Sequence, residues 1–232
     1  MVKIFISFIL LVMSSWAQAQ LSPNYLPKVP TSTSGSGLGI TGSVGVGFTN
    51  FTILDPFNKY SLDRGTYTTV ALERGFEALN LYFTMSLGHM TGSGRSNYSY
   101  QNLSTSNSYA VNDIAFNASM YDLSVGFKFK LIDKYWFGPY VEGGGIGSYQ
   151  EITYISKLDV LDAQGIDAKK KETVMGSGYY GEAGVDVMFS SKFGLKFAGR
   201  FSEERTKALE TLGKGTISFR SETYYFSALM GF

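Results

Sequence analysis

The stretch that decides the fold is Tyr121–Lys130, which reads YDLSVGFKFK. Apolar or aromatic residues alternate strictly with polar, charged or glycine residues along it. Successive side chains of a β-strand point to opposite faces, so the stretch predicts a strand with one apolar and one polar face. The same period of two recurs along the chain from residue 38 to the last residue, Phe232.

This period predicts a series of strands whose connections alternate in length. The second, fourth and sixth connections are short, and the others are long. Short turns on one side and long loops on the other are the pattern of outer-membrane barrels, and an even strand count places the last residue at the rim with the short turns. The predicted strands are 38–50, 66–74, 77–89, 119–130, 137–150, 177–189, 193–203 and 216–232.

The face opposite the apolar residues is rich in Gly, Ser, Thr and charged residues. Such a face suits the lumen of a narrow barrel, where eight strands leave just enough room for side chains. We therefore expect an all-β fold, an eight-stranded antiparallel up-and-down transmembrane β-barrel over residues 38–232. Ten strands remain possible if residues 91–118 contain a further hairpin.

The composition excludes several classes of function. The 232 residues include 20 Lys and Arg against 19 Asp and Glu, a balance that does not indicate a nucleic-acid partner. The absence of Cys excludes a disulfide framework and a thiolate metal site. Aromatic residues, at 16%, favour a pleated surface, while 27 Gly oppose long helices.

The N-terminal segment has the features of a secretory signal. Lys3 precedes a short, mostly apolar run, Ile4–Met13, and residues 17–19 form a small-x-small cleavage site. The run is too short to cross a bilayer as a helix. We expect a signal peptide over residues 1–19, a flexible periplasmic lead-in over residues 20–37, and export to the outer membrane of a Gram-negative bacterium.

Two of the short turns predict a strand register. Gly75 in Arg74–Glu77 stands first in a two-residue loop, as a type II′ turn requires, which would pair Arg74 with Glu77 and Leu72 with Leu79. The turn at residues 190–192 sets a second register, in which Phe189 faces Phe193 and Val187 faces Leu195 on the outside. That register also places Asp186 opposite Lys196 and Glu182 opposite Arg200 inside the barrel, as two pairs of opposite charge.

Charged residues on the predicted inner face form the main candidate site. The same face carries Glu182, Asp186, Lys196 and Arg200, which Lys128, Lys130 and Glu142 are expected to join. One interpretation is that these charges satisfy one another in a filled lumen, because buried charges must be paired. The other is that they gate or line a narrow pore. Since small barrels are normally filled, we favour the first.

His89 is the only histidine. It has the outward parity of Leu87, with Thr91 nearby and no Ser at a fixed spacing, so we interpret it as a residue of the membrane interface. A lone His does not build a His-rich metal site. We therefore assign no catalytic, cofactor-binding or metal-binding residues.

Aromatic residues gather at one predicted rim, where they would form an interfacial girdle: Tyr135, Trp136, Phe137, Phe189 and Phe193. At the other end we expect long solvated loops over residues 91–118, 151–176 and 203–215. The second loop contains a basic run, 169–171, that could contact the anionic groups of lipopolysaccharide.

The final stretch, Tyr224–Phe232, resembles the last strand of outer-membrane barrels. The resemblance implies that the barrel-assembly machinery reads Tyr224, Phe226, Met230 and Phe232 during biogenesis. Residues 139–147 are similar to the Pro-Tyr-x-x-x-Gly-x-Gly segment of the OmpA-like barrel superfamily. The resemblance covers roughly residues 38–232, with no peptidoglycan-binding domain after the barrel, so it points to a barrel-only member.

Fold-level resemblance does not choose a function, so three hypotheses remain. The first is a non-enzymatic structural or surface-interaction protein with a plugged lumen and long extracellular loops. The second is a narrow porin-like channel for ions or small solutes, and the third, weak for want of a catalytic triad, is a lipid-modifying enzyme. Expected partners are outer-membrane lipid and lipopolysaccharide, the assembly machinery, and an extracellular ligand bound through the loops; no cofactor and no nucleic acid are expected.

Overall fold

The computed structural model describes residues 39–54, 59–76, 80–101, 108–132, 136–155, 171–190, 192–206 and 217–232. The predicted signal peptide over residues 1–19 and the lead-in over residues 20–37 lie outside these ranges, so both stay predictions. No helix in the described ranges is long and apolar enough to cross a membrane.

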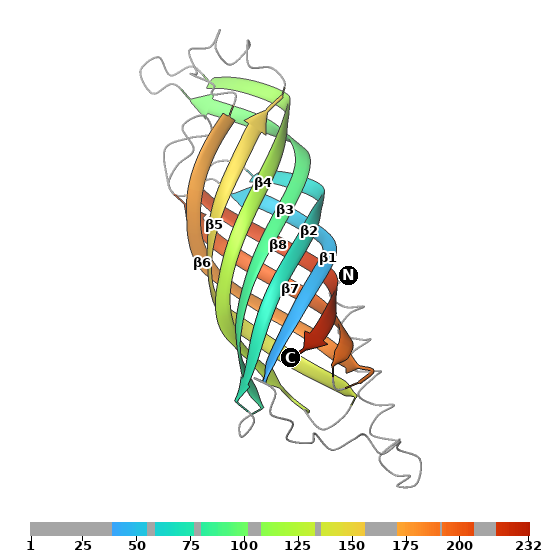
Figure 1. The fold of residues 1–232 in the computed structure, drawn as a ribbon. Coiled ribbons are helices and arrows are strands. Elements are labelled where there is room, and N and C mark those ends of the chain that lie inside the picture. The colour runs from blue at the N-terminus through green and yellow to red at the C-terminus, as the bar shows by residue number, and fades with distance from the viewer. Residues whose placement is uncertain are drawn as a thin grey trace, which may run out of the picture. The chain divides into compact units, whose positions relative to one another are not determined.

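The described residues form a closed antiparallel barrel of eight strands, in which each strand pairs with the next and β8 pairs with β1 (Figure 1). The predicted fold class is therefore confirmed. The strands are β1 (Ile40–Leu54), β2 (Lys59–Phe76), β3 (Leu81–Gln101), β4 (Ser108–Lys130), β5 (Phe137–Tyr154), β6 (Lys171–Met188), β7 (Phe193–Thr206) and β8 (Ile217–Gly231).

The two ends of the barrel differ. The short-turn end carries the connections β2–β3, β4–β5 and β6–β7 together with Phe232. At the opposite end, here called the long-strand end, β3 and β4 project beyond the other strands (Figure 1).

Most of the residues predicted as a loop over 91–118 are strand, because β3 continues to Gln101 and β4 begins at Ser108. The predicted loops over 151–176 and 203–215 are shortened in the same way by β5, β6 and β7. Within the described residues no extra hairpin enters the barrel, and the strands there number eight rather than ten.

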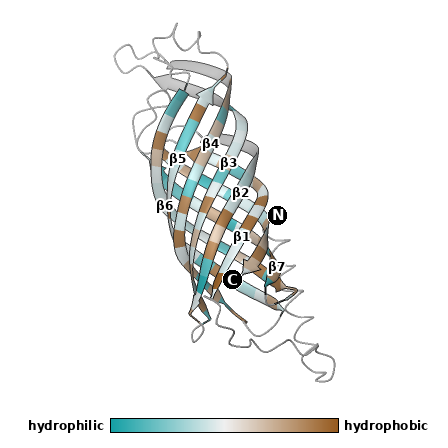
Figure 2. Ribbon diagram, viewed as in Figure 1, coloured by the Kyte–Doolittle hydropathy of each residue, from teal (hydrophilic) through white to brown (hydrophobic). Residues whose placement is uncertain are grey.

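A band of exposed apolar side chains covers the outside of the barrel next to the short-turn end. The hydropathy of the residues alternates along the strands there (Figure 2). Along β4 and the residue after it, the band runs from Leu131 to Tyr121. These are roughly ten residues, which at about 3.3 Å per residue and a tilt of about 40° rise about 25 Å. This height matches the apolar band of outer-membrane barrels. Exposed tyrosines mark the edge of the band that faces the long-strand end, here called its upper edge: Tyr121, Tyr149, Tyr179 and Tyr224.

Beyond the tyrosines the pattern of polarity inverts. The outward residues of the long-strand end are mainly polar, as at Asn50, Thr91 and Asn117. The inward residues there include a buried apolar cluster, which we call the apolar cap, and buried polar residues such as Gln150 and Glu204. A wall with a polar outside and an apolar inside is the arrangement of a water-soluble barrel, so the strands extend past the apolar band into water. The apolar cap consists of Phe51, Ile53, Tyr67, Met90, Ile114, Phe116, Met120, Ile152, Tyr154, Ile217 and Phe219.

The predicted two-residue turn at Gly75 is wrong. β2 continues through Gly75 to Phe76, Leu72 pairs with Met85 rather than Leu79, and Arg74 pairs with Phe83. Asn80, with a φ of 50°, supplies the left-handed backbone of the connection instead. The register differs from the predicted one by six residues, an even number, so the same side chains still face outward.

The second predicted register is confirmed. Val187 pairs with Leu195, Asp186 with Lys196 and Glu182 with Arg200. The Phe189 N–H donates to the Phe193 carbonyl at 2.9 Å and closes this turn.

Candidate functional site

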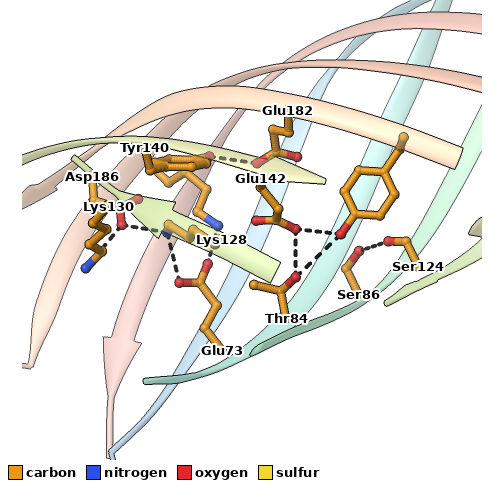
Figure 3. Close-up of polar contacts among 12 residues, drawn as sticks. Glu73, Thr84, Ser86, Ser124, Lys128, Lys130, Tyr140, Glu142, Glu182 and Asp186 are labelled. Carbon is orange, nitrogen blue, oxygen red and sulfur yellow. Dashed lines mark hydrogen bonds and ion pairs between the residues drawn. The ribbon is translucent and has the colours of Figure 1, made fainter. Parts of the chain in front are cut away.

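The candidate site is a network of charged and tyrosine side chains that crosses the lumen within the apolar band. Its central cluster consists of Glu73, Lys128, Asp186 and Lys196, from four different strands (Figure 3). The Lys128 ammonium donates to Glu73 Oε2 at 2.9 Å and to Asp186 Oδ2 at 2.6 Å. The Lys196 ammonium donates to the other oxygen of Glu73, Oε1. Each charge of the central cluster therefore has a partner of opposite sign.

Aromatic rings cover the cations of the network. The Lys128 ammonium lies 4.0 Å from the centroid of the Tyr140 ring, and the Lys196 ammonium lies 5.4 Å from the same centroid. Lys130 lies 3.6 Å from Asp186 and 4.4 Å from the centroid of the Tyr82 ring. Cation–π contacts in a desolvated site add to the ion pairs, and Lys128 is fully buried.

Two glutamates above the central cluster are held by hydroxyl groups. Thr84 and Tyr180 each donate to Glu142 Oε1 at 2.8 Å, and Tyr140 donates to Glu182 Oε1 at 2.7 Å (Figure 3). Glu142 and Glu182 are also direct neighbours in the ladder between β5 and β6. Like charges opposite one another are unfavourable, so the hydroxyl donors offset a repulsion within the wall.

Arg200 has a different partner from the one predicted. It pairs with Glu182 in the ladder, but its ion pair is with Asp122, at 3.6 Å from Nη2 to Oδ1, and Nη1 donates to the Tyr67 hydroxyl at 3.2 Å. The guanidinium also lies 4.2 Å from the centroid of the Tyr180 ring. The predicted position of Arg200 opposite Glu182 is therefore correct, but its ion pair is with Asp122, because the long Arg side chain reaches across the lumen. Asp186 and Lys196 are likewise neighbours in the ladder, while their ion pairs are with Lys128 and Glu73.

The lumen contains every charged residue that the alternation placed there, including Lys128, Lys130 and Glu142. It also contains Glu73 and Asp122, which were not assigned to the network. Asp122 follows from the parity of the opening stretch, and Glu73 from the parity of its own strand.

Glycines make the space that the larger lumen side chains occupy. A Cβ atom on Gly126 would lie 2.4 Å from the Tyr180 hydroxyl, and one on Gly144, its partner in the ladder, would lie 2.1 Å from the Val125 carbonyl oxygen. Only glycine tolerates such approach, so Gly126 leaves room for the Tyr180 hydroxyl beside β4, where it reaches Glu142 on the neighbouring strand β5.

Above the charged network, the lumen contains the apolar cap together with a small polar group, in which Ser148 donates to Glu204 Oε2 and Gln150 donates to Ser148. The hollow beside Phe51, Met90 and Met120 has a volume of about 10 Å³, which is about the space that one water molecule needs. Tyr67 joins the two regions, because its ring lies against Tyr225 at 5.6 Å while its hydroxyl accepts from Arg200.

His89 lies at the upper edge of the apolar band, as predicted, and partly exposed. Its ring stacks on Tyr121, with centroids 4.4 Å apart and planes 18° apart, and Nε2 lies 3.1 Å from the Ser119 hydroxyl. The sequence offered no Ser at a fixed spacing, and the pairing of β3 with β4 supplies one. No group of His, Asp and Glu that could hold a metal ion occurs in the described ranges.

The rim aromatics lie where the alternation placed them, with Trp136, Phe189 and Phe193 exposed at the short-turn end and Phe137 partly buried. Tyr135 lies outside the described residues. The outward row of the last strand is also exposed: Tyr224, Phe226, Met230 and Phe232.

Comparison with known proteins supports the fold. Neisserial surface protein A (NspA) has a TM-score of 0.50 and 10% identity, over 85% of this chain and 100% of that one. This chain has the fold of the small outer-membrane β-barrels. OprG from Pseudomonas aeruginosa (TM-score 0.46, 13% identity, 85% and 99% of the chains) and Ail from Yersinia pestis (0.43, 8%, 82% and 98%) are further matches. No family model and no curated protein matches the chain in sequence.

The fold and the apolar band together indicate an outer-membrane protein. In small outer-membrane barrels the short turns face the periplasm, which makes the long-strand end the extracellular one.

Proposed function

We propose that this small outer-membrane barrel has a closed lumen, does not conduct solutes, and acts through its extracellular surface. The observation that carries the proposal is the filling of the lumen by two consecutive layers, the charged network and the apolar cap. A continuous aqueous path would have to cross both.

The charged network resists opening because its members are buried and held from several strands. To free Lys128, a passing ion would have to separate it from both Glu73 and Asp186. Removing one partner of a buried ion pair costs about 3–5 kcal/mol, so an open state would be rarely populated.

The apolar cap opposes conduction for a different reason. The cap side chains offer few hydrogen-bonding groups to water or to an ion, and the polar side chains at the same level, Gln150, Glu172 and Glu204, are themselves buried. An ion in a site of low dielectric is strongly disfavoured. A barrel closed by charges alone could open by exchange of partners, but this one would also need the cap to move.

Single-channel conductance of the mature protein in a planar bilayer tests the proposal. We expect no stepwise openings from protein shown by its altered gel mobility to be folded and inserted. A variant that leaves the charges in place but lines the cap with polar groups, Met120→Ser with Phe116→Ser, should also be silent. Steady openings of the wild-type protein would contradict the proposal.

A narrow channel is the second candidate, and one observation favours it. Arg200 Nη2 and Asp122 Oδ1 are 3.6 Å apart and neither atom has a hydrogen bond, so this pair is the most loosely held of the buried ones described. If openings occur and change in Arg200→Met or Glu182→Gln, these residues act as a gate. If Arg200→Met is as silent as the wild-type protein, the channel hypothesis fails.

The last strand has the features of an assembly signal, and we include that role in the proposal. Phe226 is exposed on the outward face of β8, which closes the barrel against β1, and Phe232 is exposed directly after that strand. Phe232→Ala should lower the amount of folded protein in the outer membrane of a Gram-negative host. Phe193→Ala removes an exposed aromatic side chain from the neighbouring strand and is the matched control. Equal losses in the two variants would contradict a specific signal.

A further inference from the structure

An open groove lies on the outer wall of the barrel, just beyond the apolar band. It spans β2 to β5 and has a volume of about 550 Å³. The outward side chains that line it are Thr66, Thr91, Ser93, Asn117, Ser119, Glu151 and Thr153.

An irregularity in the wall accompanies this outer groove. Between Leu62 and Thr66, β2 has one more residue than the matching part of β3, where Gly94 and Thr91 are the partners. Such bulges bend a strand and often lie next to binding sites. Thr66 and Thr91 then share a hydrogen bond of 2.8 Å between their hydroxyls at the edge of the groove.

The lining of the outer groove carries hydroxyl, amide and carboxylate groups, and its charges are balanced. Its hydroxyl and amide groups can both donate and accept hydrogen bonds. Its one acid, Glu151, forms an ion pair of 2.8 Å with Lys171 on the neighbouring strand. A neutral ligand with many hydroxyl groups fits this lining better than an ion, which would lack a counter-charge, or an acyl chain, which would leave the polar groups unpaired.

The lower edge of the outer groove is aromatic and lies at the membrane surface. The rings of His89 and Tyr121 are stacked there, and His89 contacts Ser119 on the groove wall. Directly below, Leu87 and Leu123 are exposed on the lipid-facing wall. A molecule with a polar head in the groove could therefore extend apolar chains over these leucines.

We propose that the outer groove binds the neutral sugar headgroup of a glycolipid in the outer leaflet. The headgroup hydroxyls bond to Thr91, Asn117 and their neighbours, and the acyl chains lie against the apolar band. The proposal deepens the surface role proposed above and rests on the extracellular orientation of the long-strand end.

The geometry of His89 and Ser119 fits binding of the glycolipid better than its hydrolysis. A hydrolase would need a group that orients the second ring nitrogen of His89. Glu151 is on the wrong side for this, because it pairs in the ladder with Ser119 and bonds to Lys171.

The test measures retention of a glycolipid by the folded protein in phosphocholine micelles. The probe is a radiolabelled monoglucosyl diacylglycerol, and phosphatidylcholine with the same chains is the comparison lipid. We expect preferential retention of the glucosyl lipid, weakened about threefold to tenfold in Asn117→Ala and in Thr91→Val, since each loses a hydrogen-bonding group. Asn50→Ala removes an exposed amide from the outer wall of β1, away from the groove, and should retain the lipid like the wild-type protein.

Three outcomes would overturn the proposal. The first is equal retention of the two lipids by the wild-type protein, and the second is an equal effect of Asn117→Ala and Asn50→Ala. The third is release of fatty acid that stops in Ser119→Ala, which would make the site catalytic. The conductance test uses no glycolipid, so the two proposals can fail separately. Equal retention of the two lipids together with a silent bilayer would contradict glycolipid binding and leave the closed lumen supported. Channel openings together with specific retention of the glucosyl lipid would contradict the closed lumen and leave glycolipid binding supported.

Discussion

Glu73 on β2 and Lys196 on β7 form an ion pair although the two residues are 123 positions apart and their strands are not neighbours in the wall. β1 and β8 lie between them, so the contact spans the lumen. Together with the Lys128–Glu73 and Lys128–Asp186 contacts, it ties four strands into one unit.

Glu73→Gln should destabilise the barrel strongly. The substitution leaves Lys128 and Lys196 buried with less negative charge, and breaking a buried pair costs about 3–5 kcal/mol. Urea unfolding in lipid vesicles measures the effect. Glu222→Gln changes an exposed glutamate on β8 and should shift the free energy of unfolding by less than about 0.5 kcal/mol. Similar losses in both variants would show that Glu73 does not organise the network.

Arg200 should couple energetically to Asp122 rather than to Glu182. In a double-mutant cycle, Asp122→Asn and Arg200→Met should have an interaction energy of about 1 kcal/mol or more, because the two charges contact each other. The cycle of Glu182→Gln with Arg200→Met should be closer to additive. The reverse order of the two interaction energies would mean that position in the ladder, rather than contact across the lumen, determines the partner.

Glu142→Gln should preserve or increase stability. The amide oxygen can still accept from Thr84 and Tyr180, while one of two adjacent like charges is removed. Glu142→Leu is the control, because it leaves both hydroxyl donors without their acceptor and should cost about 1–3 kcal/mol. Thermal unfolding followed by gel mobility distinguishes the two variants, and a large loss in Glu142→Gln would contradict the argument.

An arginine scan along the outer face of β4 should locate the edge of the membrane. Val125→Arg lies within the apolar band and should cost about 2–4 kcal/mol, whereas Asn117→Arg lies beyond the tyrosines and should cost about 0–1 kcal/mol. Unfolding in lipid vesicles gives both values. Equal costs at the two positions would mean that the inversion of polarity does not mark the membrane surface.

The predicted register between β2 and β3 shows what the alternation of apolar and polar residues can and cannot predict. The outward parity of Leu72 and Val70 is correct, but their partners are Met85 and Leu87. Alternation fixes a register only to an even number of residues, since every even shift buries the same face. The position of the turn decides among these registers. The sequence predicted a turn at Gly75, but the left-handed residue of the connection is Asn80.

The sequence did not predict that the strands continue beyond the apolar band at the long-strand end, for a related reason. Residues such as Asn117 and Ser93 look like loop residues, because a strand in water does not need an apolar outer face. Its apolar face is the inner one, at Phe116 and Ile114, and this inversion becomes visible only once the position of the membrane is known.

The sequence by itself determined the strand period and the wall face of nearly every predicted side chain, and it favoured eight strands over ten. These properties follow from the alternation of neighbouring side chains, which is local. Only the tertiary structure decided that Glu73 joins Lys196, that Arg200 reaches Asp122, and that Ser119 meets His89. These contacts depend on ring closure and strand register, which bring distant positions together, and a buried charge then takes the partner within reach of its side chain.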